Sequence, residues 1–271
     1  MGLGFLGTAV QRIVVAEREN RIRAVAAGDL LQPLYRAVAA TLRLSQPEGD
    51  IILLANPNAS VGISYYGRFQ ALGTLFWENA PGLCAAAEIY SAATDDEALA
   101  LIRARRVTHL AMISTANFLG EYYRLLHPHS IPAEAKMTFG YRLTAKVPPP
   151  SWLQPLPYRP PVELRDATET VRLYKVAPGQ TEVEWRYHTA IAQLADGDVS
   201  AAEQSLEAAV ARAPAAERPV LWEAGGTAFY DYGADAGAVR FFRRALASGD
   251  NPHVAITAAW ILATSRDPAV R

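Results

Sequence analysis

Ile51-Ile-Leu-Leu-Ala55 opens the stretch that decides the fold of this chain. Two more apolar runs follow it, Ala71-Leu-Gly-Thr-Leu-Phe-Trp77 and Val107-Thr-His-Leu-Ala-Met-Ile-Ser114. Each run is short and bounded by turn-forming residues, as buried strands are. A helical segment precedes the third run, so the order is strand, crossover, strand, helix, strand, which is typical of parallel strands with right-handed connections. The sequence therefore predicts an α/β fold with a small, mostly parallel sheet flanked by helices.

The composition limits the class of protein. A chain of 271 residues has room for one large or two modest domains, and 51% hydrophobic with 20% charged residues is typical of a globular chain. The net charge of −1 supplies no basic face for a phosphate backbone, so we exclude nucleic acid as a partner. The single cysteine, Cys84, can form no intrachain disulfide.

The N-terminal residues leave two interpretations open. Residues 1–10 are apolar but lack both a basic leader and a small-residue cleavage site, so we do not expect a signal peptide. Gln11 and Arg12 end the apolar run well short of the roughly 20 residues that span a membrane. We assign residues 1–45 to a helical segment that is either a frayed or docked terminus, which the residues favour, or a juxtamembrane segment in contact with the membrane.

The α/β domain is predicted to cover residues 46–177. Val171-Arg-Leu-Tyr-Lys-Val176 alternates in polarity and is expected to close the sheet as an edge strand. Residues 147–161 are rich in proline, which lacks a backbone donor and fixes φ. We therefore expect these residues to form an extended arm, and neither a helix nor a central strand.

No residue set predicts catalysis or metal binding. Thr94-Asp-Asp-Glu97 has the pattern of a helix start with a capping box, which explains the paired carboxylates without chemistry. His109 lies in the third predicted strand and is expected to be a hydrogen-bonded core or edge residue. His127 and His129 have no carboxylate or cysteine nearby in the sequence to complete a metal site. We predict no enzyme activity, no cofactor and no metal.

Polar side chains follow the predicted strands. Ligands of open parallel sheets sit beyond the carboxyl ends of the strands, so a small-molecule site is expected there, if the chain has one. The alternative is that these side chains only cap helices and tie loops together, and we give it the greater weight. The candidate ligand loops comprise Asn56, Asn58, Tyr65, Tyr66, Trp77, Glu78 and Asn79, with Ser114 after the third strand.

Residues 181–271 carry an internal repeat. Gly197-Asp-Val-Ser-Ala-Ala202 returns as Gly233-Ala-Asp-Ala-Gly-Ala238, 36 residues later, which is close to one helix-turn-helix unit. In the second copy, large aromatic and small residues both occur along the first helix of the helix-turn-helix unit. This pattern resembles the tetratricopeptide repeat. The first copy departs from it at Arg186 and Ala190. The residues that carry the second-copy match are Trp222, Gly226, Ala228 and Phe229.

The resemblance to the tetratricopeptide repeat implies a role in holding partner proteins. We predict about two and a half repeats, and residues 253–263 would form an unpaired first helix that leaves an apolar face uncovered. The family's concave groove is lined mainly by first helices. By position, the groove would include Tyr187, Ile191, Glu223, Thr227, Tyr230 and Asp231.

Residues from about 50 to 176 resemble the soluble domain of polytopic bacterial glycosyltransferases that use lipid-linked sugars, including the catalytic subunit of oligosaccharyltransferases. The order of Tyr65-Tyr66-Gly67, Trp77-Glu78-Asn79, Asp95-Asp96-Glu97 and Val107-Thr-His-Leu carries this resemblance. The Trp-Trp-Asp-Tyr-Gly motif of the oligosaccharyltransferases is absent, and Asn56-Pro-Asn-Ala-Ser-Val-Gly stands near its place. The resemblance implies a domain on the extracytoplasmic, periplasmic face of a membrane, and no sugar transfer by this chain alone.

Three functional hypotheses follow. The leading one is a non-catalytic, membrane-associated scaffold subunit that docks on a membrane protein complex through the α/β domain and binds a partner through the repeats. The alternative is an acceptor- or sugar-recognition domain of a membrane glycosyltransferase, with Trp77 stacked on a sugar face. A free-standing enzyme is the third, and the absence of a recognisable catalytic triad argues against it.

Overall fold

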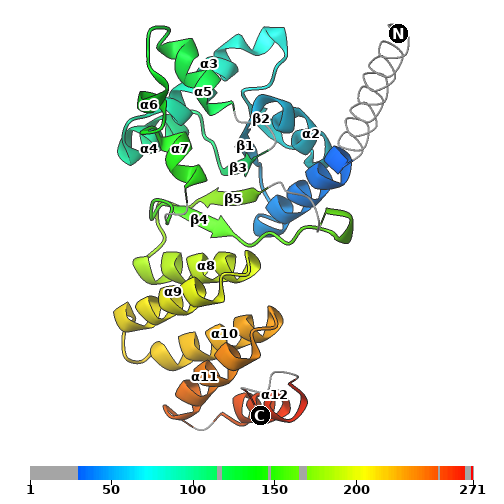
Figure 1. Ribbon diagram of the computed structural model, residues 1–271, viewed down its shortest axis with the longest axis vertical. Coiled ribbons are helices and arrows are strands. Elements are labelled where there is room, and N and C mark those ends of the chain that lie inside the picture. The colour runs from blue at the N-terminus through cyan, green and yellow to red at the C-terminus, as the bar shows by residue number, and fades with distance from the viewer. Residues whose placement is uncertain are drawn as a thin grey trace, which may run out of the picture.

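A computed structural model describes residues 30–114, 118–145, 148–164, 170–249, 251–265 and 270, with the side chains of Trp77, Pro132 and Glu163 excepted. Figure 1 shows a sheet with helices around it, followed along the chain by a stack of helices. The interpretations of residues 1–29 lie outside the described part of the chain.

The sheet has five strands in the order β2-β1-β3-β5-β4. The bounds are β1 Ile52–Ala55, β2 Gln70–Leu72, β3 His109–Ile113, β4 Leu153–Leu156 and β5 Val171–Val176. Strand β1 pairs in parallel with both β2 and β3, whereas β5 is antiparallel to β3 and β4. The predicted fold class, an α/β domain followed by an all-helical region, is confirmed. The sheet itself is mixed, since it combines parallel and antiparallel pairings.

Two strand predictions are wrong. Strand β5 does not close the sheet, because β4 lies outside it and comes from the proline-rich arm. An edge strand tolerates Pro155, since one side of it needs no backbone donor. The second run is a strand only over β2, because Gly73 takes a φ of +76° and turns the chain, and Trp77–Asn79 forms the 3-10 helix η1.

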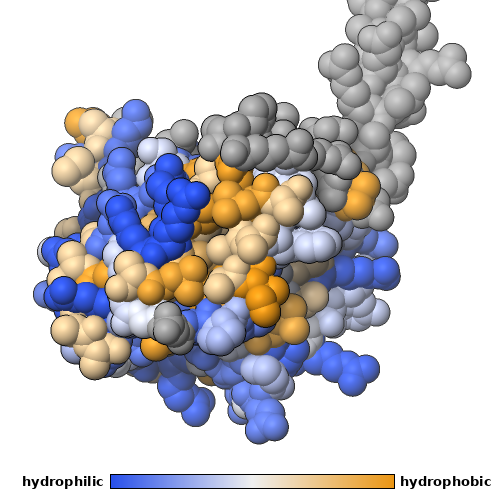
Figure 2. Space-filling view, turned by 90° about the horizontal axis from the view of Figure 1, so that it is seen from below, coloured by the Kyte–Doolittle hydropathy of each residue, from blue (hydrophilic) through white to orange (hydrophobic). Residues whose placement is uncertain are grey.

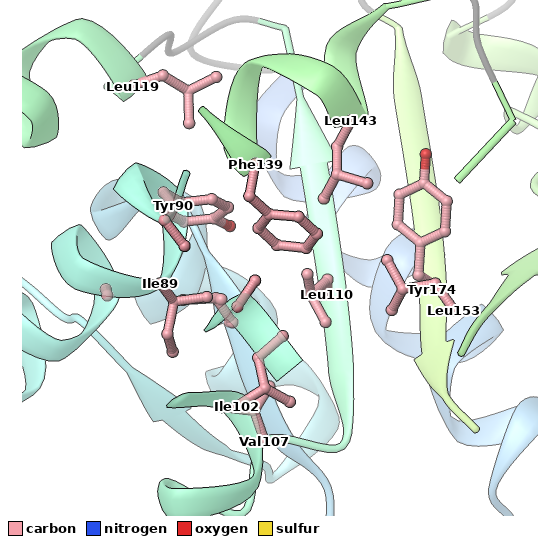
Figure 3. Packing of buried hydrophobic residues seen from close by; sticks show 14 of the residues in the cluster. Ile89, Tyr90, Ile102, Val107, Leu110, Leu119, Phe139, Leu143, Leu153 and Tyr174 are labelled. Carbon is pink, nitrogen blue, oxygen red and sulfur yellow. The ribbon is translucent and has the colours of Figure 1, made fainter. Parts of the chain in front are cut away.

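Helices cover both faces of the sheet, as the alternation of side chains along its strands requires. On one face, Leu53 and Ala55 pack against the helix over residues 30–45 and against α2 (Pro57–Gly67). On the other face, Leu54 and Leu110 pack against four helices. These helices are α3 Ala80–Ser91, α4 Asp95–Ala104, α5 Leu119–Leu126 and α7 Phe139–Thr144. Figure 3 shows Ile89, Tyr90, Leu110 and Phe139 converging in this second core.

The start of α4 has the capping residues that the sequence predicts. The hydroxyl of Thr94 accepts a hydrogen bond from the backbone N–H of Glu97 at 3.2 Å, and the Glu97 carboxylate accepts one from the backbone N–H of Ala93 at 2.8 Å. Asp95 forms an ion pair with Arg142 at 2.6 Å. These carboxylates are therefore occupied in holding the helix start and in tying α4 to α7.

The remaining helices form antiparallel pairs after β5. The first pair is α8 (Glu182–Ala195) with α9 (Val199–Arg212), and the second is α10 (Arg218–Asp231) with α11 (Asp235–Leu246). Helix α12 (Pro252–Thr264) packs on α11. The paired helices are thus present, while their identification as tetratricopeptide repeats and the domain limits at 177 and 181 stay predictions.

Close approach in the second pair depends on glycine. The rings of Trp222 and Phe241 stack with centroids 5.5 Å apart, and Phe229 meets Phe241 edge to face at 4.7 Å. A Cβ on Gly226 would lie 2.6 Å from the ring of Phe242, which is fully buried. Since protein interiors are close-packed, this ring has no free space into which it could move.

We expect Gly226→Ala to lower the free energy of unfolding by about 1–3 kcal/mol, because overpacking moves the Phe242 ring or separates α10 from α11. Urea unfolding followed by circular dichroism measures the change. Gly249→Ala is the matched control, since nothing lies within 4 Å of its added Cβ. Equal midpoints for the two variants would show that the helices do not need this contact.

His109 is a hydrogen-bonded core residue, as the sequence predicts. Its side chain is fully buried, with Nε2 3.0 Å from the hydroxyl of Ser45 and Nδ1 2.9 Å from the hydroxyl of Thr108. Burial lowers the pKa of His109 from 6.5 to about 4, and the positive charges of Lys175 and Arg43 add to the effect. The imidazole is therefore neutral in the folded protein throughout the physiological pH range.

This burial makes stability depend on pH. Between pH 6.5 and about 4 the unfolded chain binds a proton at His109 that the folded chain does not bind, so the stability present above pH 6.5 is lost as the pH falls. We expect a slope of up to about 1.4 kcal/mol per pH unit from this residue, and His109→Gln should remove it. Urea unfolding of both proteins at several pH values between 7 and 4.5 gives the difference. Parallel pH profiles would refute the assignment.

Candidate functional site

The centre of the sheet is a switch point. The connection from β1 to β2 runs through α2 on one face, and the connection from β2 to β3 runs through α3 and α4 on the other face. Strands β1 and β3 are parallel neighbours, and the chain continues from β1 to α2 on one face and from β3 to α5 on the other, which leaves a crevice beyond their carboxyl ends. The structure has a cavity of about 170 Å³ at this place.

This cavity, the switch-point cavity, is built by residues from both sides of the crevice. Asn56 follows β1, and Ile113 and Ser114 end β3. Tyr90 reaches it from α3 and Tyr122 from α5. Further lining residues are Ala111, Met112, Phe118, Leu119, Thr144, Thr170 and Arg172.

Three lining residues carry buried polar atoms without a hydrogen-bond partner among the described residues. They are Nδ2 of Asn56 and the hydroxyls of Tyr90 and Tyr122. The other amide atom of Asn56 is occupied, since Oδ1 accepts from the backbone N–H of Ala59 at 2.8 Å and caps α2. A buried polar group without a partner costs about 1–3 kcal/mol, so these three groups are costly unless a ligand or water meets them.

The two tyrosines are held rigidly and remain neutral. Their rings stack with centroids 5.8 Å apart, and both side chains are almost fully buried. Burial raises the pKa of Tyr122 and that of Tyr90, and for Tyr90 the neighbouring Tyr122 adds to the effect. Each hydroxyl can therefore both donate and accept a hydrogen bond at neutral pH.

Among the described lining residues, Arg172 is the one that carries a charge. Its Nη1 donates to the carbonyl oxygen of Leu143 at 2.9 Å and to that of Ala145, which fixes the guanidinium at the end of α7. None of the described lining residues is acidic. The unpaired groups are thus one amide donor and two hydroxyls that can donate or accept, and they suit a ligand whose groups do both.

Of the predicted ligand loops, the structure brings Asn56 and Ser114 to the same cavity. The side chain of Tyr65 is 77% exposed, and Tyr66 lies beneath Arg36, whose guanidinium is 4.9 Å from the ring centroid. The amide of Asn79 donates to the hydroxyl of Thr74 at 2.8 Å and so ties its own loop together. Asn58 and Glu78 are exposed, and the side chain of Trp77 lies outside the described part.

The sequence offers no signal for Tyr90, Tyr122 or Arg172 as site residues. Both tyrosines stand at helix positions with apolar spacing, which is the pattern of core residues. Only the packing of α3 and α5 beside the end of β3 turns them into cavity residues.

The predicted groove residues lie on α8 and α10. The carboxylate of Glu223 accepts from the side-chain amide of Asn251 at 3.0 Å, and the hydroxyl of Thr227 donates to the backbone carbonyl of Glu223. The backbone carbonyl of Asp231 accepts from Arg159 at 2.8 Å. Tyr230 is 39% exposed, and Tyr187 and Ile191 are partly buried against the helical core. Their role in binding a partner stays a prediction.

Helix α12 has apolar side chains on both its buried and its exposed sides. Val254, Ala258 and Ile261 are buried, whereas Ile256 is 70% and Trp260 60% exposed. Figure 2 looks at this end of the molecule and shows hydrophobic residues gathered among charged ones. Such a face is typical of a surface that meets another protein.

The described residues contain neither a helix that could cross a membrane nor a cluster of metal ligands. No helix there has the length and apolarity needed to cross a membrane. No group of three or more His, Cys, Asp or Glu side chains in the same part of the chain is placed to hold a metal ion.

Comparison with known proteins gives one distant likeness. The C-terminal globular domain of the oligosaccharyltransferase from Archaeoglobus fulgidus has 14% sequence identity and a TM-score of 0.33, over 48% of this chain and 86% of that domain. No protein-family model matches the sequence, and no curated protein matches it. A likeness this distant carries no conclusion about function.

We expect Tyr122→Phe to leave the free energy of unfolding unchanged or to raise it by up to about 1 kcal/mol, because it removes a buried hydroxyl that has no partner. Thr138→Val is the control and should lower it by about 1 kcal/mol, because the buried hydroxyl of Thr138 donates to the carbonyl oxygen of Ala135 at 2.7 Å. Urea unfolding of the ligand-free proteins measures both. A loss for Tyr122→Phe as large as that for Thr138→Val would show that the Tyr122 hydroxyl is satisfied.

Proposed function

We propose that the chain is a recognition domain that binds a small polyhydroxyl ligand, of the size of one sugar ring, in the switch-point cavity. The observation that carries the proposal is the set of three unpaired buried polar groups around that cavity, Asn56 Nδ2 and the hydroxyls of Tyr90 and Tyr122. This function corresponds to the sugar-recognition alternative drawn from the sequence.

The size and polarity of the cavity support a sugar. An apolar cavity of about 150 Å³ accommodates a benzene-sized molecule, so about 170 Å³ suits one six-membered ring. Sugar hydroxyls both donate and accept, which matches an amide donor and two neutral tyrosine hydroxyls. Leu119 and Phe118 add apolar surface for the C–H groups of a ring.

The proposal assigns binding and no catalysis. Among the described lining residues there is no carboxylate, histidine or cysteine that could serve as a base or nucleophile. A place beside a membrane glycosyltransferase, on the extracytoplasmic face, is what the resemblance of the first domain implies, and it stays part of the proposal.

The scaffold hypothesis remains a second candidate. The exposed side of α12, with Ile256 and Trp260, is the feature that favours a protein partner. It concerns a different part of the chain from the cavity, so one protein can have both functions. Docking on a membrane complex through the α/β region stays a prediction.

Binding of methyl glycosides tests the proposed function. We expect at least one methyl pyranoside to bind in saturation-transfer NMR, and Tyr122→Phe and Tyr90→Phe to weaken its binding by about fivefold or more, because each loses a hydrogen bond of about 1 kcal/mol. Tyr65→Phe is the matched control, since Tyr65 lies outside the cavity and should change nothing.

Two results would count against the sugar site. One is the absence of binding across a panel of neutral and N-acetylated methyl pyranosides. The other is glycoside binding that Tyr122→Phe leaves intact but Trp77→Ala abolishes, which would move the site to the loop around Trp77.

A further inference from the structure

A second and larger cleft lies where the sheet meets the helical pairs. We call it the junction cleft; its volume is about 530 Å³, and Leu156, Tyr158, Thr189, Gln193 and Asp196 line it. Helix α8 packs along β4 at this place, with β4 and β5 on one side of the cleft and α8 on the other (Figure 1). Clefts of roughly 300–1,000 Å³ are typical of sites for small molecules.

The walls of the junction cleft are preformed. Four prolines line it, Pro148, Pro149, Pro155 and Pro160. Proline fixes φ and loses almost no side-chain freedom on folding, so a ligand need not order these walls. Together with Leu156 and Val171 they give the cleft an apolar interior.

Two buried polar atoms in this cleft have no hydrogen-bond partner in the described part of the chain. They are the hydroxyl of Tyr158, from the sheet side, and Oε1 of Gln193, from α8. Tyr158 is only 9% exposed. The amide oxygen of Gln193 can only accept, so it requires a donor from the ligand.

The charges favour a cation. Asp196 follows Gln193 by three residues at the end of α8, so both side chains lie on the same side of the helix. The carboxyl end of a helix carries partial negative charge and attracts cations. Asp196 has no ion pair within the described residues.

The other charged lining residues in the described part of the chain are already engaged. Arg172 donates to the carbonyl oxygens of Leu143 and Ala145. Asp198 accepts from the backbone N–H of Ala201 at 3.1 Å and caps α9. The groups left for a ligand are therefore the carboxylate of Asp196, the amide oxygen of Gln193 and the hydroxyl of Tyr158.

We propose that the junction cleft binds a primary ammonium group that carries an apolar body, with the ammonium held by Asp196 and Gln193 and the body between Tyr158 and the proline walls. An ammonium has three donors and no acceptor, which complements the two acceptors at the end of α8. A free organic amine and a lysine side chain of a protein share this chemistry.

Benzylamine is the probe, with benzyl alcohol and benzoate as controls of the same shape. We expect benzylamine to bind in isothermal titration or chemical-shift mapping, benzyl alcohol to bind at least about tenfold more weakly because it lacks the charge, and benzoate not to bind. Nα-acetyl-lysine methylamide distinguishes the sources, because its binding indicates a lysine of a protein and its failure beside bound benzylamine indicates a free amine.

Variants assign the residues. Asp196→Asn should weaken benzylamine binding about tenfold or more, and Tyr158→Phe should weaken it less, since it removes one neutral hydrogen bond. Asp196 is exposed, so the first variant should keep its fold. Glu88→Gln removes a carboxylate from the exposed surface of α3 and should change nothing. Equal binding of benzyl alcohol and benzylamine, no benzylamine binding, or binding unaffected by Asp196→Asn would each overturn the proposal.

Discussion

The burial of strand β1 on both faces is the constraint on which the rest of the structure depends. Leu53, Leu54 and Ala55 are all fully buried, so each face of the strand needs its own helical cover. The chain meets this need by crossing first over one face, through α2, and then over the other, through α3 and α4. These opposite crossings separate the loops at the carboxyl end of β1, and the switch-point cavity is their geometric result.

The two cavities share Thr170 and Arg172, and Arg172 is the charged one of the two. The guanidinium of Arg172 is committed to the end of α7, where it donates to the carbonyl oxygens of Leu143 and Ala145. Its positive charge therefore lies at the walls of both the switch-point cavity and the junction cleft. The polarity of each site comes from the other residues: tyrosine hydroxyls and an amide in one, the end of α8 in the other.

The sequence predicted what depends on local pattern. The apolar runs correctly predicted β1 and β3, and Thr94 with Glu97 predicted the start of α4. The 36-residue repeat predicted the paired helices. The errors arose where tertiary context decides. Proline at position 155 suggested an arm, yet an edge strand accommodates it, and this displaced β5 from the edge. Of the site, Asn56 and Ser114 could be predicted from the ends of strands, whereas Tyr90 and Tyr122 have the pattern of core residues and become site residues only through packing.

The position of α8 has a consequence for the solubility of the chain. An edge strand with free backbone groups is a template for pairing with the same strand of another molecule, and such pairing leads to aggregation. Strand β4 is such an edge, and two features reduce its capacity to pair with another molecule. Pro155 removes a backbone donor, and α8 packs along the strand. A fragment that stopped at Val176 would keep the whole sheet but lose the contact of α8 with β4. The first helical pair thus protects the edge of the sheet. The α/β region and the helical region therefore depend on each other, although their architectures differ.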